Sequence, residues 1–192
     1  MRYGNGGQNI EIGRARYHHD GIITELKQIN FGVSNQNVRV YQSYDCQAHN
    51  YADSGSGWVV SGGIAEDGSI NSNIYGAKGT WLSVFYLLFD APLDSEFTLT
   101  VHGIYINPNN SPPGECWLEI DGITSDGATT VIGQKFIPNS PADLVFTYSG
   151  SGKQFIKLII LANANAINNF NVIAPAASIT VNNQQISQVQ LI

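Results

Sequence analysis

Short apolar stretches recur along the chain, separated by polar, turn-forming residues. In the segment 97–102 the alternation is strict. Its apolar residues are Phe97, Leu99 and Val101, and its polar ones are Thr98, Thr100 and His102. Such a period of two predicts a strand that buries one face. Similar stretches recur roughly every 8 to 14 residues, which predicts an all-β chain folded as an antiparallel β-sandwich, or jelly roll.

The densest apolar region runs from 81 to 123, and we take it as the centre of the sandwich. We predict strands at 38–44, 57–64, 81–89, 97–106, 115–121, 131–137, 144–150, 155–164, 167–174, 177–181 and 186–192. The segments 45–57 and 65–79 are rich in Gly, Ser, Asn and Asp and are predicted to be loops, with a weak strand inside the second.

The first 35 residues differ from the rest, and we predict that 1–35 is an N-terminal attachment or oligomerisation segment and 36–192 the β-sandwich domain. Residues 1–9 are rich in Gly and Asn and are predicted to be a mobile or partner-docked tail. The dipeptide Asp20-Gly21 predicts a hairpin turn. The piece 23–31 has apolar residues at helical spacing, but the glycines that bracket it favour strand.

Composition and charge exclude some classes of function. The chain has 192 residues, of which only 12% are charged, and a net charge of −6. Its basic residues form no cluster, which argues against a nucleic-acid partner. No apolar run reaches the roughly 18 residues of a membrane span, and the N-terminus lacks the apolar core of a signal peptide. We therefore expect a virion or extracellular protein that is exported without a secretory signal peptide.

Trp117 is the most suggestive outward residue. In 115–121, alternation directs Cys116, Leu118 and Ile120 to the core and frees the other side. If this strand pairs with 97–102, one surface would gather the candidate ligand-binding residues Trp117, Glu119, Glu115, His102 and Thr100. An indole ring beside carboxylates and hydroxyls suits sugar recognition. In the alternative, Trp117 is covered by another strand, a loop or a neighbouring subunit.

Metal and cysteine chemistry offers few candidates. Asp121 and Asp126 lie in an oxygen-rich segment and are candidates for a structural Ca²⁺, although such residues also cap turns. No other cofactor is expected. Cys46 and Cys116 are either buried thiols or a disulfide, and neither has a partner at zinc-ligand spacing.

The sequence contains none of the common hydrolase or phosphate-loop motifs. Glu119 and Asp121, two apart on one predicted strand, would lie about 7 Å apart, a separation that a pair of glycosidase carboxylates can have. In the absence of a catalytic motif we predict a non-enzymatic protein.

The runs GWVVSGGIAEDGSI, WLSVFYLLF, FTLTV and CWLEIDG resemble the jelly-roll modules of the galactose-binding-like and carbohydrate-binding-module type over about residues 36–175. This resemblance implies a β-sandwich, often with a structural calcium, and a ligand surface on a sheet face or at a loop end. Trp117 and Glu119 are the positions that it would assign to the ligand.

The low charge, the abundance of Asn and Gln and the separate N-terminal piece resemble phage tail-fibre and other virion appendage proteins. Together the two resemblances imply a homotrimeric appendage that binds glycans or another receptor on a host surface. One alternative is a purely structural virion protein whose sandwich mediates assembly. Another is a glycan-active enzyme or its accessory module.

Overall fold

A computed structural model describes the residues 2–5, 8–11, 15–19, 22–26, 28–33, 36–42, 45–55, 58–75, 80–108, 115–150, 152–164, 169–186 and 188–192, with the backbone alone up to residue 45. The chain divides into two compact units, Met1–Tyr44 and Asp45–Ile192. Each unit is described by itself. The described residues include no helix that could span a bilayer.

The described residues of the first unit form three antiparallel hairpins. They pair β1 (Arg2–Asn5) with β2 (Gln8–Glu11), β3 (Ala15–His19) with β4 (Ile22–Leu26), and β5 (Gln28–Val33) with β6 (Gln36–Gln42). The hairpin predicted around residues 20–21 and the strand character of 23–31 are confirmed. Within the predicted tail, β1 pairs with β2. Whether this hairpin is mobile or docks on a partner stays a prediction, and residues 1, 6 and 7 lie outside the described residues.

The contact boundary between the units lies after Tyr44, whereas the sequence suggested a division after residue 35. The hairpin of β5 and β6 accounts for the difference, because it continues from Gln28 to Gln42 and so crosses that position. Whether the first segment mediates attachment or oligomerisation stays a prediction.

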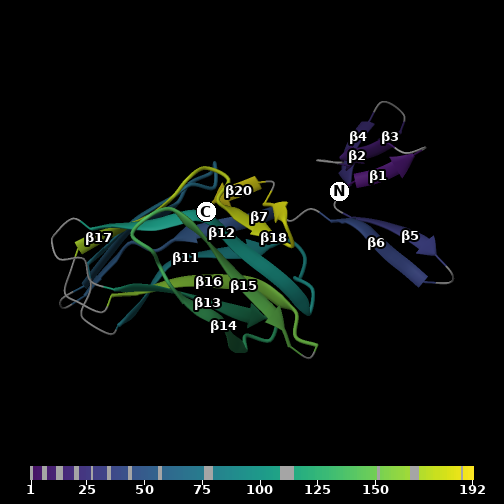
Figure 1. The fold of residues 1–192 in the computed structure, drawn as a ribbon. Coiled ribbons are helices and arrows are strands. Elements are labelled where there is room, and N and C mark those ends of the chain that lie inside the picture. The colour runs from purple at the N-terminus through teal and green to yellow at the C-terminus, as the bar shows by residue number, and fades with distance from the viewer. Residues whose placement is uncertain are drawn as a thin grey trace. The chain divides into compact units, whose positions relative to one another are not determined.

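The second unit is an all-β sandwich of two sheets (Figure 1). The six-stranded sheet has the order β14-β13-β16-β11-β7-β20. Its strands are β7 (Asp45–Asn50), β11 (Trp81–Phe89), β13 (Cys116–Thr124), β14 (Thr129–Phe136), β16 (Phe155–Ala164) and β20 (Gln188–Leu191). All neighbours in it are antiparallel except β20 and β7.

The eight-stranded sheet has the order β19-β18-β12-β17-β10-β9-β8, with β15 also paired to β12. Its strands are β8 (Asp53–Gly55), β9 (Trp58–Ile64), β10 (Ile70–Tyr75), β12 (Glu96–Pro108), β15 (Ala142–Ser149), β17 (Asn169–Ala174), β18 (Ile179–Val181) and β19 (Gln184–Gln185). The weak strand expected within 65–79 is therefore β10.

The core lies between the two sheets. It is built from alternate residues along each strand, whose side chains point inward. Leu118 and Ile120 of β13 are buried as predicted, opposite Ala162 and Ile160 of β16. Cys46 and Cys116 are both buried and no disulfide joins them. Burial raises the pKa of the Cys116 thiol to about 12, so it stays protonated and unreactive at neutral pH.

Two local predictions are wrong. The segment 45–57 contains β7 and β8 rather than a continuous loop, because its polar residues alternate with Cys46 and Ala48, which are buried under the sheet. The pairing expected between 97–102 and 115–121 does not occur. β12 pairs with β15, β17 and β18, whereas β13 pairs with β14 and β16, so the chain changes sheets between Pro108 and Cys116.

Candidate functional site

The side of the six-stranded sheet that faces away from the core carries a concentration of partly exposed aromatic and polar side chains. We call it the outer face. Strand register defines its members, because directly opposed residues on neighbouring strands point to the same side. They include Gln47, His49, Trp81, Ser83, Tyr86, Leu88, Trp117, Glu119, Asp121, Val131, Gln134, Phe136, Lys157, Ile159, Leu161 and Asn163.

One row of the outer face crosses four strands. Phe136 opposes Trp117, Trp117 opposes Asn163, and Asn163 opposes Trp81. Trp117 is 39% exposed and Phe136 40%, and their rings meet edge to face with centroids 6.0 Å apart. The two tryptophans are separated by two strand spacings, about 9.5 Å. The row therefore places two indole rings on either side of a single amide.

A cavity lies beside the Trp81 end of this row. β7 ends opposite Phe85, and beyond that point the backbone N–H of Tyr51 donates to the carbonyl of Val84 at 3.0 Å. The first residues of β11 therefore have no β7 residue beside them, and side chains from other elements border the space there. The cavity, of about 300 Å³, is lined by Tyr51, Trp58, Val60, Thr80, Trp81, Leu82 and Ser83. We call it the aromatic pocket.

A cluster of rings continues from this pocket along the outer face. Tyr51 meets His49 and Tyr86 edge to face, with centroids 5.5 and 5.9 Å away. His49 stacks on Tyr86 at 5.2 Å, and the Lys157 ammonium lies 3.8 Å from the centroid of the Tyr86 ring. Burial, and then the neighbouring Tyr86, raise the pKa of the Tyr51 hydroxyl, so that it is neutral and able to donate a hydrogen bond at physiological pH.

Two carboxylates, Glu119 and Asp121, lie on the outer face on the same strand as Trp117. Glu119 is only 7% exposed and accepts a hydrogen bond from the side-chain amide of Gln134. Asp121 has one buried carboxylate oxygen, Oδ1, without a hydrogen-bond partner. Burial, and then the negative charge of Glu119, raise the pKa of Asp121. This carboxylate is therefore held in an unfavourable environment.

Replacing Asp121 by asparagine is expected to stabilise the sandwich unit at neutral pH, by no more than about 1 kcal/mol because solvent screens the charge. A raised pKa means that ionisation is disfavoured in the folded state. The contribution of Asp121 to the stability of the parent protein should then be fully present below the ordinary carboxyl pKa of 3.8 and be lost as the pH rises through the raised value. Urea denaturation at neutral pH and below pH 3.8 measures both ends of this window.

Asp126→Asn is the matched control of opposite sign. Hydrogen bonds from the Thr124 hydroxyl and the Ala128 N–H lower the pKa of Asp126, so its contribution to stability is present above the ordinary pKa and lost as the pH falls through the lowered value. This variant should be less stable than the parent at neutral pH. If both variants changed the free energy of unfolding at neutral pH by the same amount and in the same direction, the environment described for at least one of the two carboxylates would be wrong.

The predicted site residues divide between the two sheets. Trp117 and Glu119 share the outer face, and Glu115 is exposed immediately before β13. Thr100 and His102 are instead on β12 of the eight-stranded sheet, where Thr100 is 6% exposed. The structure therefore brings the tryptophan and the carboxylates together and separates the hydroxyl and the imidazole from them.

His102 belongs to a separate hydrogen-bonded group. Its Nδ1 lies 2.9 Å from Oδ2 of Asp143, and its Nε2 lies 3.0 Å from Oγ1 of Thr180. The other Asp143 oxygen accepts the N–H of Gly103 at 2.9 Å. The group joins β12, β15 and β18 at the irregularity between Val101 and Ile104. Its contacts account for the position of His102 without a ligand.

The calcium candidates do not form a ligand cluster. Asp126 accepts hydrogen bonds from within its own turn, and Asp121 lies in the middle of β13. Within the described ranges, no group of three or more His, Cys, Asp or Glu side chains is arranged to hold a metal ion. The turn-capping interpretation therefore accounts for Asp126.

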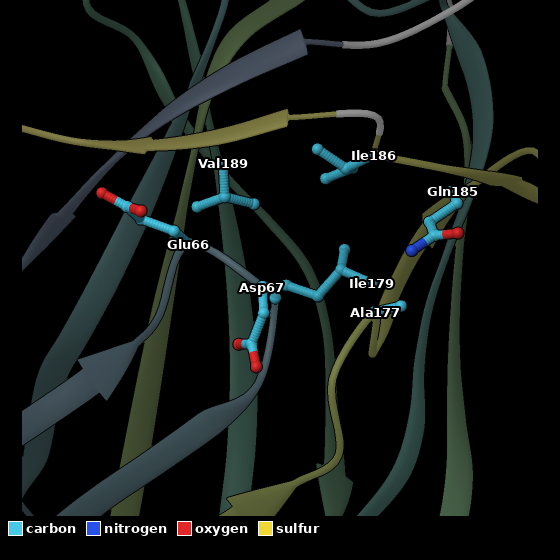
Figure 2. Close-up of a pocket in the computed structure, with 8 residues that line it drawn as sticks. Glu66, Asp67, Ala177, Ile179, Gln185, Ile186 and Val189 are labelled. Carbon is cyan, nitrogen blue, oxygen red and sulfur yellow. The ribbon is translucent and has the colours of Figure 1, made fainter. Parts of the chain in front are cut away.

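A second cavity, of about 230 Å³, lies where the turn after β9 meets the C-terminal strands. It is lined by Glu66, Asp67, Gly68, Ala177, Ile179, Gln185, Ile186 and Val189. Figure 2 shows the Glu66 carboxylate pointing away from the side chains of Ile179 and Ile186. The Asp67 carboxylate accepts hydrogen bonds from the backbone and hydroxyl of Ser69. The described lining of this cavity contains no aromatic ring, and its acidic groups point away or cap a turn.

Sequence reasoning missed several residues of the outer face, among them Trp81, Tyr86, Phe136 and Asn163. A register shift between Ser83 and Phe85 explains the first of them. Strict alternation from Trp81 would place it on the same side as Phe85 and Leu87, which are buried, whereas the shift leaves Trp81 outside. Phe136 and Asn163 can be assigned to the site only when the strand order is known, because they flank Trp117 from β14 and β16.

No protein-family model matches the chain, and no curated protein matches it. Solved structures of similar fold include the Clostridium thermocellum N-terminal endo-1,4-β-D-xylanase 10B CBM22-1–GH10 modules complexed with xylohexaose. That match has 11% identity and a TM-score of 0.41, and it covers 73% of this chain and 28% of that chain. The chain thus spans little more than a quarter of that protein.

Two further structures are carbohydrate-binding modules by name. The CBM22-1 xylan-binding domain of Paenibacillus barcinonensis Xyn10C has 11% identity and a TM-score of 0.38, covering 76% of this chain and 99% of that one. The C-terminal family 22 module of Clostridium thermocellum Xyn10B has 14% identity and a TM-score of 0.40, covering 73% and 88%. At these identities and TM-scores the similarity does not show what this chain binds.

Proposed function

We propose that the sandwich unit binds glycans through its outer face and that it is not an enzyme. The observation that carries this proposal is the row in which Trp117 and Trp81 lie on either side of Asn163. Flat indole rings stack on the C–H faces of pyranose sugars, and amides and carboxylates fix the hydroxyl groups around the ring edge. The row and its neighbours supply both kinds of group on one surface.

The carboxylates of the outer face do not suit glycosidase catalysis. A glycosidase needs one carboxyl group to protonate the leaving oxygen and another to attack or to activate water. Glu119 is nearly covered and already bound to Gln134. Glu119 and Asp121 also lie side by side on β13 and project in the same direction. Such a pair does not lie on opposite faces of a sugar.

We further propose that the chain with both units belongs to a virion or extracellular appendage protein and that it acts as a homotrimer. Single glycan contacts are weak, and several copies in one assembly would bind a surface with much higher avidity. The three hairpins of the first unit support self-association, because a two-stranded hairpin is marginally stable by itself in water. Host or other surface glycans would be the receptor.

A structural role in a particle is the second candidate. Trp117, Phe136 and Val131 are all exposed apolar side chains, and they lie on β13 and the edge strand β14. Apolar groups gathered at a sheet edge also suit a contact between subunits. In that case Trp117 would be covered in the assembly and no glycan would bind there.

A glycan array followed by calorimetry tests the proposal with Trp117→Ala. We expect this variant to lose affinity at least about tenfold, since it removes one stacking platform, while it folds and assembles as the parent does. Val145→Ala is the matched control, because Val145 is a 44% exposed apolar residue of the other sheet. Its affinity should be unchanged.

The possible outcomes separate the candidates. Failure of the parent protein to bind any glycan at millimolar concentration would overturn the glycan proposal. Loss of assembly in Trp117→Ala, measured by light scattering, would favour the structural role. A parent protein that scatters as a monomer would overturn the homotrimer.

A further inference from the structure

We infer that the outer face recognises the end of a glycan chain and that the aromatic pocket takes its terminal, uncharged sugar. The inference rests on the proposed function and specifies its ligand. It follows from the two sides of the row, because one reaches the edge strand β14 and the other meets the aromatic pocket.

The aromatic pocket lies at the Trp81 side of the row. Opposite Phe85 the neighbouring strand β7 ends, and the aromatic pocket replaces it. Tyr51, which follows β7, and Trp58, the first residue of β9 in the other sheet, form its walls together with Trp81. A sugar chain that reaches this point meets side chains from both sheets. At the opposite side, Phe136 lies on the edge strand β14, so a chain can continue past it.

The size of the aromatic pocket suits one sugar ring. Its volume of about 300 Å³ is at the lower end of small-molecule sites. Three aromatic rings line it, and the hydroxyls of Thr80 and Ser83 can bond to sugar hydroxyls. The space therefore fits a terminal residue rather than a continuing polymer.

The described lining of this pocket contains no charged side chain. A carboxylate placed there would lose hydration without gaining an opposite charge, which is costly. The charged groups of the outer face lie on other rows, at Glu119, Asp121 and Lys157. The pocket thus favours a neutral terminal sugar over a uronic or sialic acid.

The sugars that adjoin the terminal one would lie along the row on the outer face. Trp117 is about 9.5 Å from Trp81, two strand spacings, with Asn163 between them. A monosaccharide would occupy the pocket alone, while a longer ligand would also stack on Trp117. Affinity should therefore rise with the first few sugars and then stop rising.

The experiment uses the full chain and neutral linear oligosaccharides of increasing length from the series that binds best on the array. Titration calorimetry gives both affinity and stoichiometry. We expect one bound protein per chain end whatever the length. We also expect affinity to fall at least about tenfold when the terminal sugar is oxidised to a uronic acid. Stoichiometry that rises with chain length, or equal affinity for the oxidised ligand, would overturn the inference while leaving glycan binding intact.

Two variants assign the effect to the pocket. Trp58→Ala should weaken binding of the shortest ligands about tenfold, with Trp58→Phe restoring part of it. Thr80→Trp fills the pocket from an exposed position, which protects the fold. The Thr80→Trp variant should no longer prefer the ends of glycan chains. Binding unchanged in Thr80→Trp would place the terminal sugar elsewhere, and absence of any glycan binding by the parent would overturn both this inference and the proposed function.

Discussion

Replacing Gly62 by alanine is expected to destabilise the sandwich unit by about 3 to 5 kcal/mol, because a left-handed backbone and a steric clash add together. Gly62 lies in β9 with a φ of +82°. A Cβ at this position would lie 3.3 Å from the carbonyl carbon of Asn71, on the adjacent strand β10, and closer still to its oxygen. Both strands would have to separate to admit it. Chemical denaturation gives the change in the free energy of unfolding.

Gly127→Ala is the control for this prediction. Gly127 has almost the same backbone conformation, with a φ of +85°, but nothing lies within 4 Å of the position that a Cβ would take. Its replacement should cost only the conformational part, about 1 to 2 kcal/mol. The difference between the two variants measures the clash. Equal costs would show that the approach of β9 to β10 is not as close as described.

Phe155→Ala should cost about 3 to 5 kcal/mol, the range for removing a fully buried phenylalanine from a core. Phe155 is the first residue of β16 and is 0% exposed. Its ring meets those of Tyr148 and Phe97 with centroids 4.9 and 6.1 Å away. It also fills the space over Gly122, where a Cβ would lie 2.6 Å from the ring. Truncation would leave a cavity bounded by both sheets.

Phe136→Ala provides the comparison on the outer face. Phe136 is 40% exposed and contacts Trp117 edge to face, so its truncation should change the free energy of unfolding by less than about 1 kcal/mol. Thermal or urea denaturation of both variants measures the contrast. A cost for Phe136→Ala close to that of Phe155→Ala would mean that Phe136 is buried in solution, as in the subunit contact considered above.

The fold class could be predicted because most strands of the sandwich have one buried side. In β13 the alternation of Cys116, Leu118 and Ile120 with Trp117 is the same in sequence and structure, and Trp117 is exposed as expected. Apolar residues at a period of two carry this information locally. The position of each strand in its sheet is not local information, because it depends on contacts between distant segments.

The candidate site illustrates this difference. Thr100 and His102 were placed beside Trp117 on the assumption that consecutive strands pair, as they often do. β12 and β13 instead belong to different sheets. Trp81 was missed for another reason, the register shift after Ser83, which reverses the two sides of β11 without any sequence signal such as Gly or Pro.

β7 and β20 also determine how the sandwich responds to tension. They are parallel neighbours, with Asp45 opposite Gln188 and Ala48 opposite Leu191. Tension applied between Asp45 and Ile192 pulls the two strands along their length in opposite directions, so their hydrogen bonds, including Ile192 N–H to Ala48 at 3.0 Å, carry the load together rather than one after another. This shear arrangement resists extension better than peeling, and rupture of the pair would be governed by the unfolding rate rather than by equilibrium stability.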